Sequence, residues 1–257
     1  MISSRDVGRL RNAVPFWMSL GTLPLAAAGA WYGGWTVLLL PLFTWGLFDL
    51  LDLVLGLNEE NADPATDETE LFWYRLVTLI WAPLQLAMIF GTIWFVTHVG
   101  HLSLIETITL FAGIGIVSGA VGIVYAHELM HQKSPTERWL GDILMASVLY
   151  SHFRTEHLLV HHLWVGTPRD AVTARYNEGF HRFFWRVLFE CPVSAWRAER
   201  AMLARRDLPA LHRTNPFWRY GALQLLMLGL ALALGGWPGL ALFVWQAIVA
   251  VWQLELV

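Results

Sequence analysis

The sequence contains few charged residues and a single cysteine, and both shortages narrow the class of protein. Asp, Glu, Lys and Arg make up 14% of the 257 residues, and Cys191 is the sole thiol. One cysteine excludes an internal disulfide and a cysteine-based metal or iron–sulfur site. The formal net charge of -3 gives no indication of a nucleic acid partner.

The sequence is instead rich in apolar residues. They account for 56% of the chain, and the mean hydropathy is +0.48. This composition is too apolar for an ordinary soluble domain and predicts an integral membrane protein.

The apolar residues occur in long runs. A transmembrane helix needs about 20 largely apolar residues to cross a hydrocarbon core of about 30 Å. Six stretches meet this requirement, at residues 14–33, 35–57, 72–97, 102–126, 217–234 and 238–257. We therefore predict an all-α bundle of about six transmembrane helices, which forms one membrane domain over residues 1–257. The pair Gly115 and Gly119 favours a central place for the fourth span, because small residues let helices approach closely.

The Lys and Arg residues are unevenly distributed over this predicted topology. If the N-terminus is cytoplasmic, the turns at 98–101 and 235–238 lie outside, and neither contains Lys or Arg. The positive-inside rule then predicts that the N-terminus and the polar region 127–216 are cytoplasmic.

Two histidine clusters stand at the start of that polar region. They supply five imidazoles within 36 residues: His127, His131, His157, His161 and His162. Histidines four residues apart share a helix face, and this spacing occurs in both clusters. A tetrahedral zinc ion takes four ligands, so five histidines with nearby carboxylates suggest a dinuclear centre. Imidazole suits zinc, copper, iron and nickel, so the ligand type does not choose the metal.

Further polar residues flank these predicted ligands. Glu128, Glu156 and Asp170 could accept hydrogen bonds from the outer nitrogens of ligand histidines. They could equally be charges at headgroup level that pair with neighbouring arginines. We expect His152 to support the second cluster rather than to bind metal.

The first cluster, His127-Glu128-Leu-Met-His131, also matches the H-E-x-x-H motif of zinc proteases, in which the glutamate is the general base. Such a protease needs one further ligand, whereas the second cluster offers three histidines. A membrane zinc metalloprotease is therefore an alternative to an oxygen-activating enzyme.

The segment after the second cluster is basic and contains aromatic residues. Its arginines include Arg182, Arg186, Arg197, Arg200, Arg205 and Arg206. This composition is typical of an amphipathic stretch on anionic lipid. It would also suit the docking of a small acidic electron-transfer protein, and the two interpretations are compatible.

Longer motifs resemble a known family. His127-Glu-Leu-Met-His-Gln-Lys133, Tyr150-Ser-His-Phe-Arg-Thr-Glu-His-Leu-Leu-Val-His-His162 and Val165-Gly-Thr-Pro-Arg-Asp170 are similar to segments of the membrane-bound non-haem di-iron alkane monooxygenases, within the wider membrane fatty acid desaturase and hydroxylase group. The resemblance implies that the five histidines bind two iron ions. It further implies O2 as co-substrate and hydroxylation of a hydrophobic substrate, most simply a terminal alkane carbon. Electrons would come from NAD(P)H through a reductase and a rubredoxin or ferredoxin, at a bacterial inner membrane.

The sequence also departs from the family. Leu158, Leu159 and Val160 stand where the second box usually has polar residues and a glycine. The resemblance implies a third histidine box after the sixth span, so we expect a C-terminally truncated chain with an incomplete di-iron centre. The alternatives within the group are a fatty acid desaturase, another lipid or aryl-methyl hydroxylase, and an inactive truncated homologue.

Overall fold

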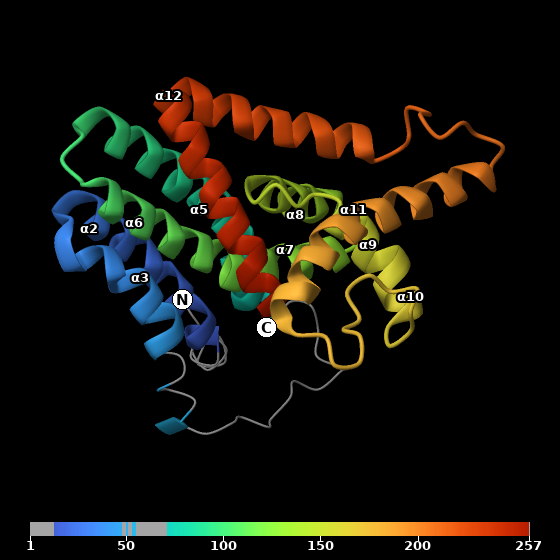
Figure 1. Ribbon diagram of the computed structural model, residues 1–257, viewed down its shortest axis with the longest axis horizontal. Coiled ribbons are helices and arrows are strands. Elements are labelled where there is room, and N and C mark those ends of the chain that lie inside the picture. The colour runs from blue at the N-terminus through green and yellow to red at the C-terminus, as the bar shows by residue number, and fades with distance from the viewer. Residues whose placement is uncertain (1–12, 48–49, 51–52, 55–70, 257) are drawn as a thin grey trace, which may run out of the picture.

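The structure is a computed structural model that describes residues 13–47, 50, 53–54 and 71–256. These residues form helices and connecting segments, with no strand among them, which confirms the predicted all-α class (Figure 1). The 3₁₀ helices are η1 (Met18–Gly21) and η2 (Gly34–Leu38), and the π-helices are η3 (Leu42–Leu47), η5 (Ser118–Ile123) and η6 (His157–His161). The α-helices are α2 (Thr22–Tyr32), α3 (Leu39–Pro41), α5 (Phe72–Val99), α6 (Leu104–Val117), α7 (Val124–His131), α8 (Pro135–Ser147), α9 (Phe153–Glu156), α10 (His162–Trp164), α11 (Phe180–Ala204) and α12 (Phe217–Leu256).

Four helical stretches are long and apolar enough to cross a membrane. They cover Ala13–Tyr32, Phe72–Val99, Leu104–His131 and Phe217–Leu256, and a shorter apolar helix covers Gly34–Leu47. The fifth and sixth predicted spans are the two halves of the last stretch, α12. The second predicted span extends partly beyond the residues that the structure describes.

A glycine divides α12 into those two halves. Gly236 has a φ of 61° and a ψ of -157°, a combination that L side chains rarely adopt. Pro238 follows it and starts the second half, where a missing backbone N–H is tolerated. The chain therefore reverses at Gly236, and the second half packs on α5 and α6 (Figure 1).

Small residues hold this second half close to the fourth predicted span. A Cβ atom added to Gly115 would lie 2.6 Å from the carbonyl oxygen of Gln246, and one added to Gly119 would lie 2.5 Å from that of Ala250. Because neither position has room for a methyl group, the two helices approach through their backbones.

The stretch Leu104–His131 carries the first histidine cluster at its far end. Ser103 starts it with a capping box, in which the Ser103 side chain accepts from the Glu106 N–H while the Glu106 carboxylate accepts from the Ser103 N–H. It ends at Gln132, whose backbone is extended. At about 1.5 Å per residue, 28 residues extend roughly 42 Å, more than the hydrocarbon thickness. His127 and His131 therefore lie at the end of the apolar bundle, beyond its most hydrophobic part.

Candidate metal centre

Four histidines from two separate segments meet at one point. His127 and His131 come from α7, His157 comes from η6 and His162 begins α10. The Nε2 atom of His157 lies 2.8 Å from that of His127, 2.9 Å from that of His162 and 3.4 Å from that of His131. One candidate ligand atom from each of the four residues lies within 4.8 Å of the others.

This spacing fits a single metal ion. Four nitrogens at about 2.1 Å from one tetrahedral ion lie about 3.4 Å from one another. The Nε2 separations around His157 are close to that value, and their rings converge from different directions, with interplanar angles of 75° toward both His127 and His162. The cluster can therefore close around one ion without rearrangement of the backbone.

A π-helical turn decides which histidines of the second box join the cluster. In an α-helix, residues four apart share a face, which predicts that His157 pairs with His161. In η6 the N–H of His162 donates to the carbonyl of His157, five residues earlier. This wider turn brings residues five apart toward the same face, so His162 joins His157 in the cluster. Turns of this kind cannot be read from side-chain spacing alone.

His161 faces a different partner. Its Nδ1 atom lies 2.9 Å from Oδ2 of Asp170, a carboxylate with no exposed side-chain surface. Asp170 also accepts from the backbone N–H of Val172 and from the hydroxyl of Thr173. The structure thus places Asp170 on an outer nitrogen of a predicted ligand, where it can fix the ring orientation.

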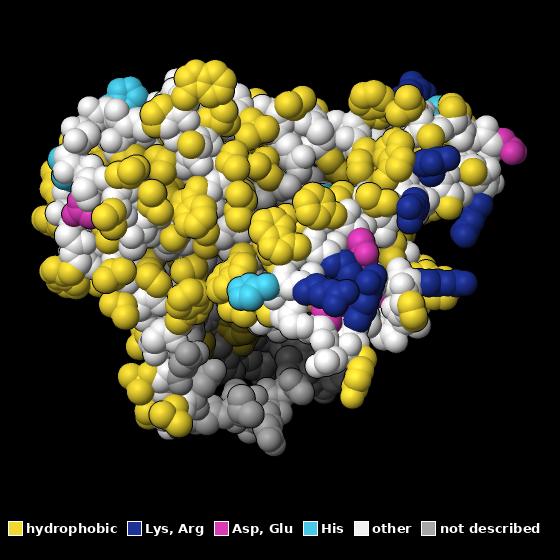
Figure 2. Space-filling view, in the orientation of Figure 1, with side chains coloured by type: hydrophobic (Ala, Val, Ile, Leu, Met, Phe, Trp, Pro, Cys, Tyr) yellow, Lys and Arg dark blue, Asp and Glu magenta, His cyan; other side chains and the backbone are white. Residues whose placement is uncertain are grey.

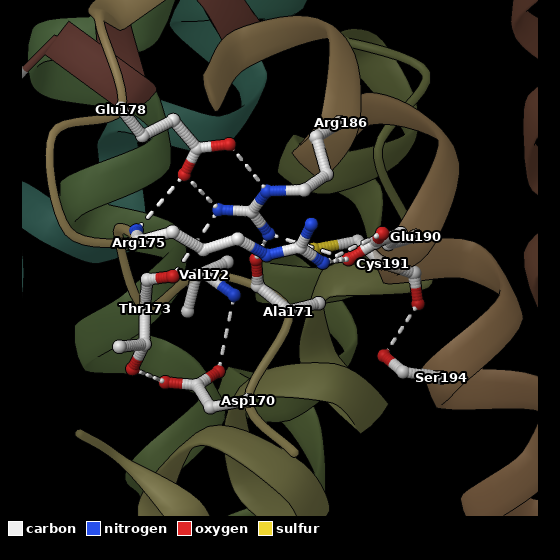
Figure 3. A network of polar contacts seen from close by, with 10 residues as sticks. All are labelled: Asp170, Ala171, Val172, Thr173, Arg175, Glu178, Arg186, Glu190, Cys191 and Ser194. Atoms are coloured by element: carbon white, nitrogen blue, oxygen red, sulfur yellow. Dashed lines mark hydrogen bonds and ion pairs between the residues drawn. The ribbon is translucent and has the colours of Figure 1, made fainter. Parts of the chain in front are cut away.

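An ion pair anchors the segment that carries Asp170. Arg186 of α11 binds the Glu178 carboxylate through two nitrogens, at 2.8 and 2.7 Å, and donates to the carbonyls of Ala171 and Thr173 (Figure 3). These bonds lower the pKa of Glu178 to about 2. They fasten the segment after the second box to α11 and so fix the position of Asp170.

The other two acidic residues near the histidines have different surroundings. Glu128 is exposed, and its Oε1 lies 3.5 Å from Nδ1 of His127. Glu156 is fully buried, and neither of its oxygens has a hydrogen-bond partner among the described residues. Burial, followed by the charges of Asp170 and Glu255, raises the pKa of Glu156 to about 8. A buried carboxyl without donors needs a proton or a cation, so Glu156 suits a position beside a metal ion.

His152 and His157 are both kept neutral by their surroundings. Burial lowers the pKa of His152 to about 4, and its Nε2 has no partner within the described part of the chain. The pKa of His157 falls to about 3, first through burial and then through the neighbouring imidazoles. A neutral imidazole is the form that binds metal.

Sequence reasoning missed one residue of this region. Glu255, near the end of α12, accepts a hydrogen bond of 3.2 Å from the hydroxyl of Tyr150. Tyr150 belongs to the second motif, but Glu255 lies about a hundred residues further along the chain. The sequence feature that could have revealed Glu255 is its position as an acidic residue at the end of a long apolar helix.

Apolar helices that could span a bilayer, with a histidine cluster at one end of the bundle, are the features of a membrane-type protein with a candidate metal site formed by histidine boxes. Comparison with known families agrees with this class. The fatty acid desaturase family model matches residues 102–257, and the chain belongs to that family.

Curated relatives include alkane monooxygenases. The chain is 33% identical to alkane 1-monooxygenase 2 of Pseudomonas aeruginosa, over 94% of this chain and 63% of the relative. It is also 33% identical to alkane 1-monooxygenase 1 of the same organism, over 82% of this chain and 56% of the relative. The xylene/toluene monooxygenase hydroxylase component XylM of Pseudomonas putida is 25% identical, over 83% of this chain and 57% of the relative. These matches confirm the resemblance seen in the sequence, although the chain spans only about three fifths of each relative.

Proposed function

We propose that this protein takes part in the oxygen-dependent hydroxylation of a hydrophobic substrate, most simply at the terminal carbon of an alkane. The observation that carries the proposal is the cluster of His127, His131, His157 and His162 at the end of an apolar helical bundle. The similarity of the chain to alkane 1-monooxygenases supports this choice of reaction.

The same residues suggest how one iron ion and part of a second iron site could be held, in line with the incomplete di-iron centre expected from the sequence. The four clustered histidines would bind one ion. His161, oriented by Asp170, and the buried Glu156 lie next to the cluster and would contribute to a second site. When bound, such irons supply the activation of O2. Asp170 orients the His161 ring, and the low pKa of His157 keeps that ring neutral.

The substrate and the reaction have close alternatives. XylM, by its name, belongs to a xylene/toluene monooxygenase, which supports an aryl-methyl substrate. The family name supports a fatty acid desaturase or another lipid hydroxylase. The H-E-x-x-H motif would permit a zinc protease, but the clustered histidines include two from outside that motif.

We further propose that the histidine end of the bundle is cytoplasmic, in a bacterial inner membrane, and receives electrons there. Lys and Arg side chains gather on the right of Figure 2, over α11 and the connection to α12. Arg182, Arg197 and Arg200 are exposed on α11. They would attract a small acidic carrier such as a rubredoxin or ferredoxin, reduced in turn by NAD(P)H through a reductase. Arg186, which also belongs to the predicted basic segment, is half-buried with its guanidinium paired to Glu178, so it contributes less to this surface.

Product analysis tests the proposal. The protein in membranes, supplied with iron, a reducing system and O2, should convert an alkane to the primary alcohol. Parallel reactions with xylene, a fatty acid and a peptide separate the alternatives. Products from the peptide alone would favour the protease, and no product from any substrate would favour an inactive homologue.

A further inference from the structure

The central histidine of the cluster lacks the outer partner that its neighbours have. The Nε2 atom of His157 faces the other clustered histidines, and among the described residues no hydrogen bond reaches its Nδ1 atom. By contrast, Nδ1 of His127 lies 3.5 Å from Glu128, and Nδ1 of His161 lies 2.9 Å from Asp170. Metal-binding histidines are usually oriented by such an outer partner, so another contact must orient the His157 ring.

Two neighbouring rings stack on this imidazole. The phenyl ring of Phe153, four residues earlier, lies 5.2 Å from His157 between centroids, with an interplanar angle of 20°. The His161 ring, four residues later, lies at 5.5 Å and 20°. Nearly parallel rings at these distances form offset stacks, a favoured arrangement of aromatic side chains. Rotation of the imidazole would break both stacks, so ring packing restrains His157 where a hydrogen bond does not.

Phe153 is itself supported from behind. It is 8% exposed, and the Tyr150 ring stacks on it at 5.8 Å and 25°. The Tyr150 hydroxyl donates to Glu255 of α12 at 3.2 Å. The preceding residue, Leu149, has a φ of 55°, a left-handed conformation that is rare for a large side chain. Such strain persists only where the surrounding structure fixes it, so Tyr150 and Phe153 form a rigid support for His157.

We propose that Phe153 is a positioning residue for His157 and holds the imidazole plane ready for the metal ion by ring stacking. Phe153 supplies no ligand atom and acts through His157. The role rests on the metal centre of the proposed function and deepens it, because it names the residue that replaces an outer hydrogen-bond partner. A ring that is already oriented loses less freedom when the ion binds, which strengthens binding.

Cobalt(II) binding tests the proposal on the whole protein in lipid nanodiscs. Competition with a chelator gives the affinity, and the visible absorption spectrum of the saturated protein reports the geometry of the ligands around the ion. Phe153→Leu removes the ring and should weaken binding by roughly tenfold, the lower end of the range for loss of an outer partner. Its spectrum should differ from that of the wild type, because an unrestrained imidazole binds the ion in a different orientation.

Two further variants separate positioning from general stability. Phe153→Tyr keeps the ring and should keep the wild-type affinity and spectrum. Phe90→Leu removes a ring that is 6% exposed and stacks on Phe243 at 5.5 Å and 15°, within the apolar bundle. It should lower the unfolding temperature, as loss of a buried ring does, but leave cobalt(II) affinity and spectrum unchanged. A wild-type affinity and spectrum in Phe153→Leu would overturn the proposal, as would equal losses in Phe90→Leu or Phe153→Tyr.

This result can be distinguished from that of the hydroxylation assay, because cobalt(II) binding needs no O2, reductant or substrate. An inactive protein with the expected cobalt(II) pattern would contradict the proposed reaction and support the role of Phe153. An active hydroxylase in which Phe153→Leu binds cobalt(II) normally would contradict the role of Phe153 alone. Absence of cobalt(II) binding by the wild type would overturn both the candidate metal centre and the role of Phe153.

Discussion

At the scale of single residues, His157 lies at the centre of the cluster. Its Nε2 is within 3.4 Å of the Nε2 atoms of three other histidines, and its low pKa keeps the ring neutral. His161 is adjacent in the same box but is oriented by Asp170 instead. The same residue type thus has two different surroundings within one turn of helix.

A substitution of Asp170 tests whether this carboxylate orients His161. Asp170→Asn keeps the shape but removes the charge that orients His161. Loss of such an outer partner typically weakens metal binding by about 10- to 100-fold. Competition with a chelator measures this affinity. Asp207→Asn, an exposed acid outside the site, is the matched control, and equal affinities for the two variants would contradict the role of Asp170.

Glu178 gives a prediction about pH. Its folded pKa of about 2 lies below the ordinary pKa of 4.5 for a glutamate, because Arg186 stabilises the charged form. The stabilisation is therefore present above pH 4.5 and is lost as the pH falls toward 2. Glu178→Gln should remove this part of the pH dependence, measured as denaturation midpoints between pH 4.5 and pH 2. Parallel curves for variant and wild type would show that the ion pair does not act in this way.

At the scale of elements, a buried carboxylate ties three helices together around the second histidine box. Asp142 of α8 is 2% exposed and accepts hydrogen bonds of 2.8 Å from Arg154 of α9. Arg219 of α12 lies 3.1 Å from the same carboxylate. Since α9 continues directly into η6, which carries His157, these contacts help to fix the position of His157 through residues that lie outside the candidate metal centre.

Asp142→Asn should therefore be strongly destabilising. Removal of one partner from a buried ion pair costs up to about 3–5 kcal/mol when the remaining charge stays buried, and the Arg154 side chain left without its partner is only 17% exposed. The control is Arg175→Gln, which breaks an exposed pair with Glu190 and should cost less than about 1 kcal/mol. Denaturant titration of both variants measures the difference, and similar losses of stability would contradict this account.

Several elements could be predicted from the sequence, and the reasons differ. The apolar runs predicted the membrane-type helices, because hydrophobicity over about 20 residues is a strong signal. The glycine pair predicted a central, closely packed fourth span, and the structure identifies α12 as the helix that Gly115 and Gly119 approach. The π-helical turn of η6 was not predictable, because no residue type marks it. It moved His162 into the cluster and left His161 beside Asp170.

At the scale of the whole molecule, the structure separates an apolar bundle from a charged end. Hydrophobic side chains cover most of the left of Figure 2, whereas Lys and Arg lie mainly on the right. This polarity was predictable from the distribution of charges along the chain. The contact between Tyr150 and Glu255 was not, because it depends on how distant helices pack.

The exposed arginines of α11 allow a whole-molecule prediction. Replacement of Arg182, Arg197 and Arg200 by Gln should slow reduction by an acidic carrier, since charge steers such encounters. The effect should shrink as salt rises toward 1 M, where the screening length is about 3 Å. Stopped-flow reduction measures the rate, and metal content should stay unchanged. Equal reduction rates for the variant and the wild type at low salt would contradict the proposed docking surface.

The most direct test of the central claim is the metal content of the purified protein, measured by elemental mass spectrometry after supply of iron. We predict that the wild type binds iron and that His157→Ala loses it. His181→Ala, an exposed histidine outside the cluster, should bind as much as the wild type. Iron retained by His157→Ala, or no iron in the wild type, would contradict the assignment of these histidines as a metal centre.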